Sequence, residues 1–352
     1  MLLAVAEDLA RDGGFRVVTT WDRRLPAPRW PDGLEVRIVA GQTEEATASE
    51  ELARNADTVW IIAPECDDVL GRRLDILGSQ VARPFNCSAA ASRLCGDKLR
   101  LAEWLSNRGV PTPETVAATP AATASASGWT NDMRGETPPI LWPIVVKPRD
   151  GAGSQSTFVV SGPGLLPPPL LGWETVKGFM EAEPWKGGWI AQPFLSGRSL
   201  SLAAIIRSQK DFDLLPAGEQ HLSRDGRLGY CGGTIPATEA PVNALETIVS
   251  SVIERMEGLS GWVGFDLLVP DDHPDVPILI EINPRLTTSY IGYRALTGKN
   301  LARRIASGAI EGGRIQPFAT ASRSAPVRFR ADGTLERPGD RPPQSGPTTF
   351  PN

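Results

Sequence analysis

The chain has 352 residues and a formal net charge of -5, so it is long enough for two or three units that each bury a core. An acidic chain without a long Lys/Arg run does not fit a protein that coats nucleic acid. No stretch is apolar enough over a sufficient length to span a bilayer. These features favour a protein that acts on small molecules.

The cysteine pattern and the N-terminal sequence bear on the compartment. Four cysteines show no CxxC spacing: Cys66, Cys87, Cys95 and Cys231. That pattern disfavours a zinc site and is typical of reduced thiols. The first residues also lack the basic start and apolar run of a signal peptide. The sequence therefore predicts a soluble, cytoplasmic protein.

Residues 1–86 alternate helical and strand-like patterns, which predicts a small parallel α/β unit. The segments are LLAVAEDLAR, FRVVTTW, EVRIVAG, EEATASEELARN, DTVWIIAPE and DVLGRRLDILGSQ. Such units usually begin with a strand, and this one begins with a helix, as expected if the start codon lies upstream of the one used here. Asn86 or Ser88 is expected to cap a helix that runs to about Leu105.

A second α/β unit is expected over residues 87–312. Residues 119–139 are rich in Ala, Ser, Thr and Pro and predict a loose excursion whose role the sequence does not reveal. ILWPIVVKPRDGAGSQSTFVV and GWIAQPFLSGRSLSLAAII each predict two strands, and PVNALETIVSSVIERMEG predicts a helix. Residues 313–352 are mostly polar and rich in proline, and are expected to form a largely disordered extension.

A glycine-bearing loop follows Lys147 closely, with Gly151, Gly153, Ser154 and Ser156. Glycines let backbone N–H groups approach phosphate oxygens, hydroxyls add donors, and a lysine supplies a compact charge. An ordinary turn is the alternative, because such sequences are common. The spacing does not match a P-loop.

The stretch VGFDLLVPDDHPDVPILIEINPRLTTSY is the most informative part of the chain. It predicts two strands joined by a polar hairpin loop. Leu279, Glu281 and Asn283 would share one face of the second strand, and Asp266 of the first strand would lie opposite the polar residues of that face. Ile278, Ile280 and Ile282 would then face a core. Two carboxylates and an amide oxygen on one face suit Mg²⁺ that carries nucleotide phosphates. A solvated outer face of a hairpin is the alternative.

The order of these parts resembles the ATP-grasp superfamily of carboxylate-amine ligases, over roughly residues 1–310, with EINPR its most specific motif. The resemblance implies an α/β ATP-grasp fold preceded by a Rossmann-like domain, with ATP between two subdomains. Lys98 and Lys147 would hold phosphates, assisted by Gly151, Gly153 and Ser154. Surface solvation of these lysines is the alternative. The adenine would meet Gln192, Pro193, Phe194 and Leu195, for which an ordinary strand edge is the alternative.

The resemblance also implies a reaction through an acyl phosphate, with Mg²⁺ or Mn²⁺ as cofactor. Asp266, Glu281 and Asn283 would bind the metal, and Lys147 and Arg285 would act in catalysis. Arg285 would stabilise the acyl phosphate or bind the acid, because its planar fork suits oxyanions. A structural salt bridge is the alternative for Arg285.

The phrase EINPRLTTSYIGYRAL, with YCGGTIPA upstream, is most similar to the ATP-grasp group that contains tyramine-glutamate ligases. It implies a glutamate-type carboxylate and an amine such as tyramine as substrates. Two departures stand out: Ser199 stands where many relatives carry a ribose-binding glutamate, and Gly264 stands near where D-alanine ligases have an arginine. A ligase for another amino acid or a peptide, or a non-catalytic nucleotide-binding protein, are the alternatives. The sequence does not indicate an oligomeric state.

Overall fold

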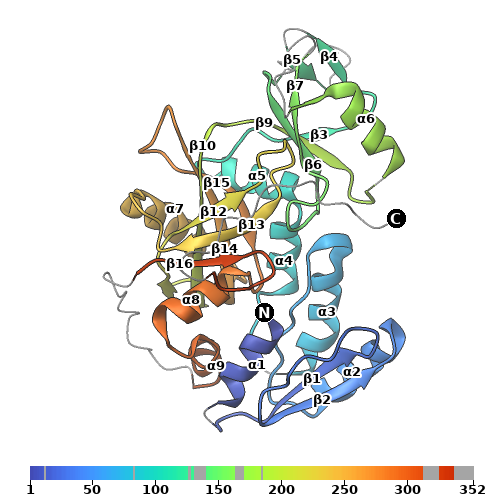
Figure 1. Ribbon diagram of the computed structural model, residues 1–352, viewed down its shortest axis with the longest axis vertical. Coiled ribbons are helices and arrows are strands. Elements are labelled where there is room, and N and C mark those ends of the chain that lie inside the picture. The colour runs from blue at the N-terminus through green and yellow to red at the C-terminus, as the bar shows by residue number, and fades with distance from the viewer. Residues whose placement is uncertain are drawn as a thin grey trace.

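The computed structural model describes residues 1–11, 13–81, 84–125, 128–130, 140–162, 170–183, 185–311 and 325–336. A small α/β unit lies at one end, a five-stranded sheet at the other, and a seven-stranded sheet lies between them (Figure 1). Among the described helices, none has the length and apolar character needed to cross a membrane.

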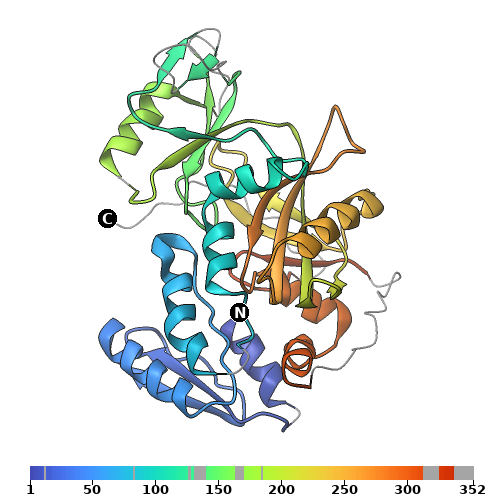
Figure 2. The ribbon, with the colours of Figure 1, turned by 180° about the vertical axis from the view of Figure 1, so that it is seen from behind.

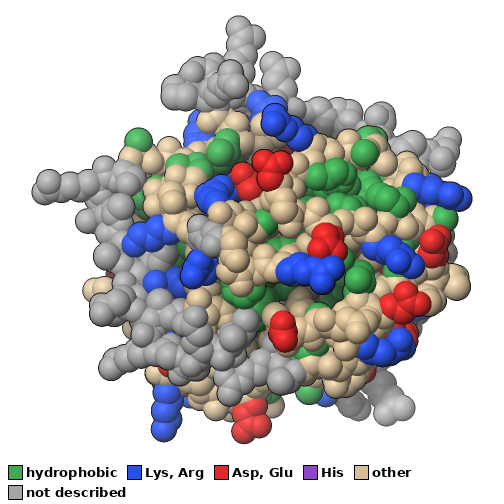
Figure 3. All heavy atoms as spheres, turned by 90° about the horizontal axis from the view of Figure 1, so that it is seen from below, with side chains coloured by type: hydrophobic (Ala, Val, Ile, Leu, Met, Phe, Trp, Pro, Cys, Tyr) green, Lys and Arg blue, Asp and Glu red, His purple; other side chains and the backbone are tan. Residues whose placement is uncertain are grey.

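The N-terminal unit contains a parallel strand pair, as predicted. Its elements are α1 (Leu2–Ala10), β1 (Val17–Asp22), β2 (Leu34–Val39), α2 (Gln42–Arg54) and α3 (Val69–Leu77). Figure 3 views the end that carries β1, β2 and α2, where basic, acidic and hydrophobic side chains are interspersed. The predicted strand DTVWIIAPE is wrong, because residues 58–64 form no strand within the part of the chain that the structure describes. The Asn86 side chain instead accepts from the N–H of Ile61 and donates to its carbonyl, each at 2.8 Å.

The helix expected to run to Leu105 is two helices, α4 (Ala89–Gly96) and α5 (Lys98–Ser106). Ser88 caps α4, as one of the two expected caps, by accepting from the N–H of Ala91. Asp97 has extended backbone and caps α5 by accepting from the N–H of Arg100. This break places Lys98 at the first position of α5. Figure 2 shows α4 and α5 passing from the small unit towards the five-stranded sheet.

The five-stranded sheet has the order β3-β9-β6-β7-β8. Its strands are β3 (Val116–Ala118), β6 (Ile144–Pro148), β7 (Phe158–Ser161), β8 (Leu171–Gly172) and β9 (Trp189–Pro193), with α6 (Trp173–Ala182) packed on them. The expected loose excursion contains a hairpin of β4 (Thr123–Ser125) and β5 (Gly128–Thr130). Trp129 is fully buried, with its ring centroid 5.7 Å from that of Trp173, so this part is anchored. Residues 131–139 lie outside the described residues.

The central sheet has the order β15-β14-β10-β12-β13-β16, and β11 also pairs with β10. Its strands are β10 (Gly197–Ser208), β11 (Asp211–Leu214), β12 (Gly218–Leu222), β13 (Tyr230–Ile235), β14 (Gly261–Pro270), β15 (Ile278–Asn283) and β16 (Val327–Arg330). β16 falls inside the extension expected over 313–352, so residues 327–330 of that extension belong to the sheet; most of the remainder lies outside the described residues.

The helices cover the central sheet on both faces. Leu202, Ala204 and Ile206 of β10 pack with α7 (Val242–Arg255). Ala203 and Ile205 point the other way and share a core with α1, α8 (Ser289–Thr297) and α9 (Leu301–Glu311). This alternation is the period-two pattern of a strand buried on both faces.

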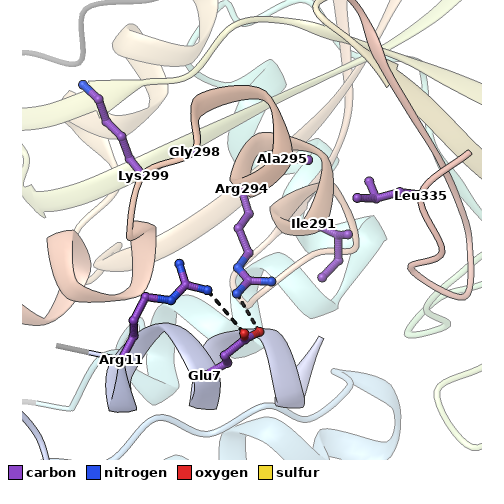
Figure 4. Close-up of a pocket in the computed structure, with 8 residues that line it drawn as sticks. All are labelled: Glu7, Arg11, Ile291, Arg294, Ala295, Gly298, Lys299 and Leu335. Atoms are coloured by element: carbon purple, nitrogen blue, oxygen red, sulfur yellow. Dashed lines mark hydrogen bonds and ion pairs between the residues drawn. The ribbon is translucent and has the colours of Figure 1, made fainter. Parts of the chain in front are cut away.

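A buried ion pair fastens α1 to α8. The Asp8 side chain is fully buried and accepts from the Tyr290 hydroxyl at 2.5 Å and from Arg294 Nε at 2.8 Å. Arg294 also donates to the more exposed Glu7, and Figure 4 shows Arg11 and Arg294 both reaching that carboxylate. The N-terminal unit is therefore tied to α8, which packs on the central sheet, by a charged contact centred on the buried Asp8.

We expect Asp8→Asn to lower the free energy of unfolding by about 3 kcal/mol, because a neutral amide weakens the charge-assisted hydrogen bonds that the fully buried Asp8 accepts from Tyr290 and Arg294. Glu7→Gln is the matched control: it alters a contact of the same arginine at a half-exposed carboxylate, and should cost less than about 1 kcal/mol. Urea unfolding of the three proteins measures both values. Equal losses in the two variants would contradict this account of Asp8.

Candidate active site

The predicted hairpin is confirmed, and it brings the polar side chains together. Asp266 lies directly opposite Glu281, and Asn283 pairs with Gly264. Asn283 Nδ2 donates to Asp266 Oδ2 at 2.9 Å, and Gln220 Nε2 of β12 donates to Asp266 Oδ1 at 2.8 Å. Two carboxylates and an amide oxygen therefore meet on adjacent strands.

The predicted facing of the second strand is wrong in part. Leu279 and Ile282 both belong to the buried core, whereas strict alternation predicted that Leu279 would share a face with Glu281. Ile278 and Ile280, which were predicted to face the core, are only partly buried. The register shifts between Asp266 and Leu267, which pairs with Leu279, so that Ile280 is the extra residue of a β-bulge. A bulge changes the direction of the neighbouring side chains. Here it allows Leu279 to face the core while Glu281 faces the polar cluster.

Both predicted lysines are buried beside this cluster. Lys98 is 7% exposed and Lys147 is 8% exposed, so neither is an ordinary solvated surface lysine. Lys98 Nζ lies 3.4 Å from Glu281 Oε1 and donates to the Gly151 carbonyl. A buried ammonium group is costly unless it is paired or serves a ligand. The two lysines, from α5 and β6, thus face carboxylates presented by the central sheet.

The burial of this cluster shifts its pKa values. Burial lowers the pKa of Lys147 to about 8, an effect that Glu281 partly opposes and Lys98 reinforces. Burial, and then the charge of Glu281, raise the pKa of Asp266. For Glu281, burial favours the neutral acid, but Lys98, Lys147 and Arg285 together outweigh it and lower the pKa. Glu281 is therefore the firmly ionised carboxylate of the pair.

The donor set fits a hard divalent cation. Asp266 is partly buried and makes no ion pair within the described ranges, although a carboxylate removed from water is ordinarily paired with a cation. Asp266, Glu281 and Asn283 offer carboxylate and amide oxygens, which suit Mg²⁺ or Mn²⁺ better than softer metals. Within the described part of the chain, no group of three His, Cys, Asp or Glu side chains could hold a metal. The amide of Asn283 is thus needed to complete the set.

Arg285 is held beside the cluster by a residue that the sequence did not single out. Arg285 Nε donates to Glu65 Oε2 at 2.7 Å, and one of its terminal nitrogens lies 3.4 Å from Asn283 Oδ1. Glu65 follows the apolar run DTVWIIAP, and an acid directly after such a run is the only local signal that could have identified it. Arg285 therefore forms a salt bridge with Glu65, which is the structural role considered as the alternative for it, and it lies next to the candidate metal ligands.

The glycine-bearing loop lies against Lys98 through the Gly151 carbonyl. Gly153 has φ +65°, and Ser154 and Ser156 also have positive φ, at 59° and 47°. Non-glycine residues in this region store strain and are concentrated at ligand-binding loops. The structure thus brings the predicted phosphate loop to one of the two predicted phosphate lysines.

The predicted adenine segment joins the two sheets. Gln192 is buried in β9, and its side chain donates to Thr115 Oγ1 at 2.8 Å. Pro193 ends β9, the N–H of Phe194 donates to the Pro143 carbonyl, and Leu195 continues towards β10. The four residues lie at the junction between the subdomains, but the Gln192 side chain already has a protein partner.

Gly264 explains one departure noted from the sequence. A Cβ atom there would lie 2.7 Å from Thr287 Cγ2 and 3.5 Å from Asn283 Cβ. The position therefore has no room for an arginine side chain unless Thr287 moves.

Two protein-family models match the chain. The ATP-grasp domain matches residues 95–289, and the pre ATP-grasp domain matches residues 15–91. The chain is similar to the tyramine–L-glutamate ligase of Methanocaldococcus jannaschii, at 23% identity over 263 residues that cover 74% of this chain and 67% of that protein. It is also 22% identical to the corresponding ligase of Methanocaldococcus fervens, over 68% of this chain and 62% of that protein. The match thus spans about two thirds of each relative.

Solved structures share the fold at low sequence identity. An L-amino acid ligase from Bacillus licheniformis superposes with a TM-score of 0.66 at 16% identity, over 93% of this chain and 76% of that chain. An N5-carboxyaminoimidazole synthetase from Staphylococcus aureus, complexed with ADP, gives 0.66 at 16% identity, over 90% and 76%. The predicted α/β architecture with a preceding α/β unit is confirmed.

Proposed function

From the premise that this chain belongs to the ATP-grasp family of carboxylate-amine ligases, we propose that it joins an amino-acid carboxylate to a primary amine through an acyl phosphate. The observation that carries this proposal is the buried cluster at the junction of the two sheets. Lys98 and Lys147 face Glu281 there, and Asp266 lies opposite Glu281. Such a cluster provides cations for phosphate oxygens and oxygen ligands for a divalent metal.

Each group has a part in the two steps. In the first, a carboxylate oxygen of the acid attacks the γ-phosphorus of ATP, an O–P bond forms, and ADP leaves. Lys98, Lys147 and the N–H groups around Gly151, Gly153 and Ser154 hold the phosphates, while Gln192 to Leu195 meet the adenine. In the second, the neutral amine attacks the acyl carbon, a C–N bond forms, the C–O bond to phosphate breaks, and phosphate leaves with the proton that the amine nitrogen loses. Arg285 would offset charge on the acyl phosphate.

Asp266, Glu281 and Asn283 would hold Mg²⁺ or Mn²⁺. The bound metal would offset negative charge on the transferring phosphoryl group. Without the metal, the negative charges of Asp266 and Glu281 would repel an incoming triphosphate.

The substrates that we propose are a glutamate-type acid and an amine such as tyramine. The relatives named tyramine–L-glutamate ligase support this choice, together with the segment EINPRLTTSY. Both substrates are small molecules, and the free thiols of the chain suit a cytoplasmic reaction.

We further propose domain limits at 1–86 for the N-terminal unit, 87–312 for the ATP-grasp domain and 313–352 for the extension.

The proposal is tested by ADP release with L-glutamate and tyramine, each alone and together. An acyl phosphate must be shielded from water until the amine arrives, so we expect rapid ADP release only when both substrates are present. Full-rate release with glutamate alone, or turnover with D-alanine but not glutamate, would contradict the glutamate-amine assignment.

A further inference from the structure

A cavity of about 430 Å³ lies between the N-terminal unit, the α4–α5 helices and the loop that follows β6. Its lining includes Glu65, Asp68, Ser92, Arg93, Arg100 and Asp150. Glu65 also holds Arg285, so one side chain connects this cavity to the candidate metal ligands. The cavity therefore borders the proposed reaction centre without overlapping the lysine and carboxylate cluster.

Most charges around the cavity are already paired. Arg93 Nε lies 3.0 Å from Asp68 Oδ1, and a terminal nitrogen of Arg149 lies 2.6 Å from Asp97 Oδ2. The Arg100 guanidinium, by contrast, makes no hydrogen bond or ion pair within the described ranges, although Asp97 lies near enough for its pKa to be lowered by the arginine. Among the described lining residues, Arg100 is thus a cation available to an anion, while Lys186 lies 3.9 Å from Asp67 Oδ1.

Three residues that line the cavity carry polar atoms without partners. Ser92 is 2% exposed, and its hydroxyl has no hydrogen-bond partner among the described residues. Glu65 Oε1 and Asp150 Oδ1 are also buried atoms with no hydrogen-bond partner among the described residues. Leaving such groups unpaired is destabilising, so native proteins seldom do so without a ligand or water. Each of these oxygens can accept a hydrogen bond from an ammonium group.

The backbone conformation around residues 67–71 lets the Asp68 carboxylate line the cavity. A Cβ atom on Gly71 would lie 2.0 Å from Asp68 Oδ1, so only glycine allows that carboxylate its position. Asp67 and Asp68 both have positive φ, at 53° and 56°. Strain of this kind persists where the surrounding structure imposes it, and often marks ligand sites.

We infer that this cavity binds the zwitterionic head of an α-amino acid. The ammonium group would lie against Glu65, Asp150 and Ser92, and the α-carboxylate would pair with Arg100. This inference rests on the proposed function, because it assigns the cavity to one of the two substrates of that reaction. The bound amino acid can be the acid substrate or the amine substrate. The two cases are distinguished by which pair of substrates, compared below, shows a preference for the α-carboxylate.

Matched substrates isolate the carboxylate contact. In the acid arm, L-glutamate is compared with 4-aminobutyrate, which lacks the α-carboxylate, with tyramine as amine. In the amine arm, L-tyrosine is compared with tyramine, with L-glutamate as acid. In one arm we expect the carboxylate-bearing substrate to have at least about a tenfold higher kcat/KM, and Arg100→Gln to remove that preference. The responding arm identifies the source.

Two further variants separate binding from a structural role. Arg108→Gln removes an exposed arginine from the C-terminal end of the same α5 segment, where it lies over the Trp104 ring, and should leave both preferences unchanged. Ser92→Ala removes a hydroxyl that has no protein partner, so the fold should be as stable as before while KM for the bound amino acid rises several-fold with little change in kcat. A loss of stability with unchanged KM would indicate a structural hydroxyl and contradict the inference.

Equilibrium dialysis with radiolabelled L-glutamate and L-tyrosine keeps the two proposals distinct. Arg100-dependent binding of either amino acid without ADP release in any combination would refute the proposed function and support the cavity. Turnover with preferences that Arg100→Gln leaves unchanged in both arms would overturn the cavity assignment and leave the ligase proposal standing. Absence of both binding and turnover would overturn both.

Discussion

Glu281→Gln is expected to lower the rate of ADP formation by at least about a hundredfold while the fold survives. Glu281 is the carboxylate that Lys98, Lys147 and Arg285 keep ionised despite its burial. Glutamine has nearly the same shape but offers the metal and both lysines no charge. The loss should therefore appear in kcat at saturating ATP, and should not be restored by raising the Mg²⁺ concentration.

The control for this variant is Glu246→Gln, which removes an exposed carboxylate from α7. It should have wild-type kcat and wild-type metal dependence. Thermal unfolding of both variants checks the fold, and ADP release measured across a Mg²⁺ titration checks the activity. Near-normal turnover of Glu281→Gln at limiting Mg²⁺ would show that the metal assignment is wrong.

The sequence predicted the candidate site best where local rules determine geometry. Asp266 and Glu281 lie in adjacent strands separated by a short polar loop, so pairing alone brings them together. The bulge at Ile280 could not be read from the sequence, because an extra residue in a strand of Ile and Leu leaves the apolar pattern intact. The expected cluster therefore formed, but with Leu279 on the opposite face.

Contacts across long stretches of chain were beyond the sequence. Glu65 meets Arg285 across 220 positions, and no local pattern encodes that pairing. Of the two expected helix caps, Ser88 caps α4, whereas the Asn86 amide satisfies the backbone of Ile61, 25 residues away. Strand β16 is four residues long, and its composition resembles that of a polar tail. It is stabilised by pairing with β13, which its own sequence does not reveal.

Lys147→Met should weaken ADP binding about tenfold to a hundredfold, because it removes one charge-assisted contact to a phosphate oxygen. The fold should tolerate the change. Burial already disfavours the ammonium form of this lysine, so a buried methionine of similar length restores apolar packing without a desolvation cost. Lys210→Met, in the exposed turn after β10, is the control and should bind ADP as the wild type does.

The pKa of Lys147 supplies a second and more specific measurement. Burial lowers that pKa to about 8, so part of the population of free protein lacks the proton at pH 8. Phosphate oxygens favour the charged lysine and should raise its pKa, so that ADP binding at pH 8 takes up a fraction of a proton. Above pH 8 the affinity for ADP should fall as this proton becomes harder to acquire. Calorimetric titration in buffers of different ionisation enthalpy measures the uptake, which Lys147→Met should abolish and Lys210→Met should retain. If Lys98→Met and Lys147→Met both bind ADP as tightly as the wild type, neither lysine holds the phosphates.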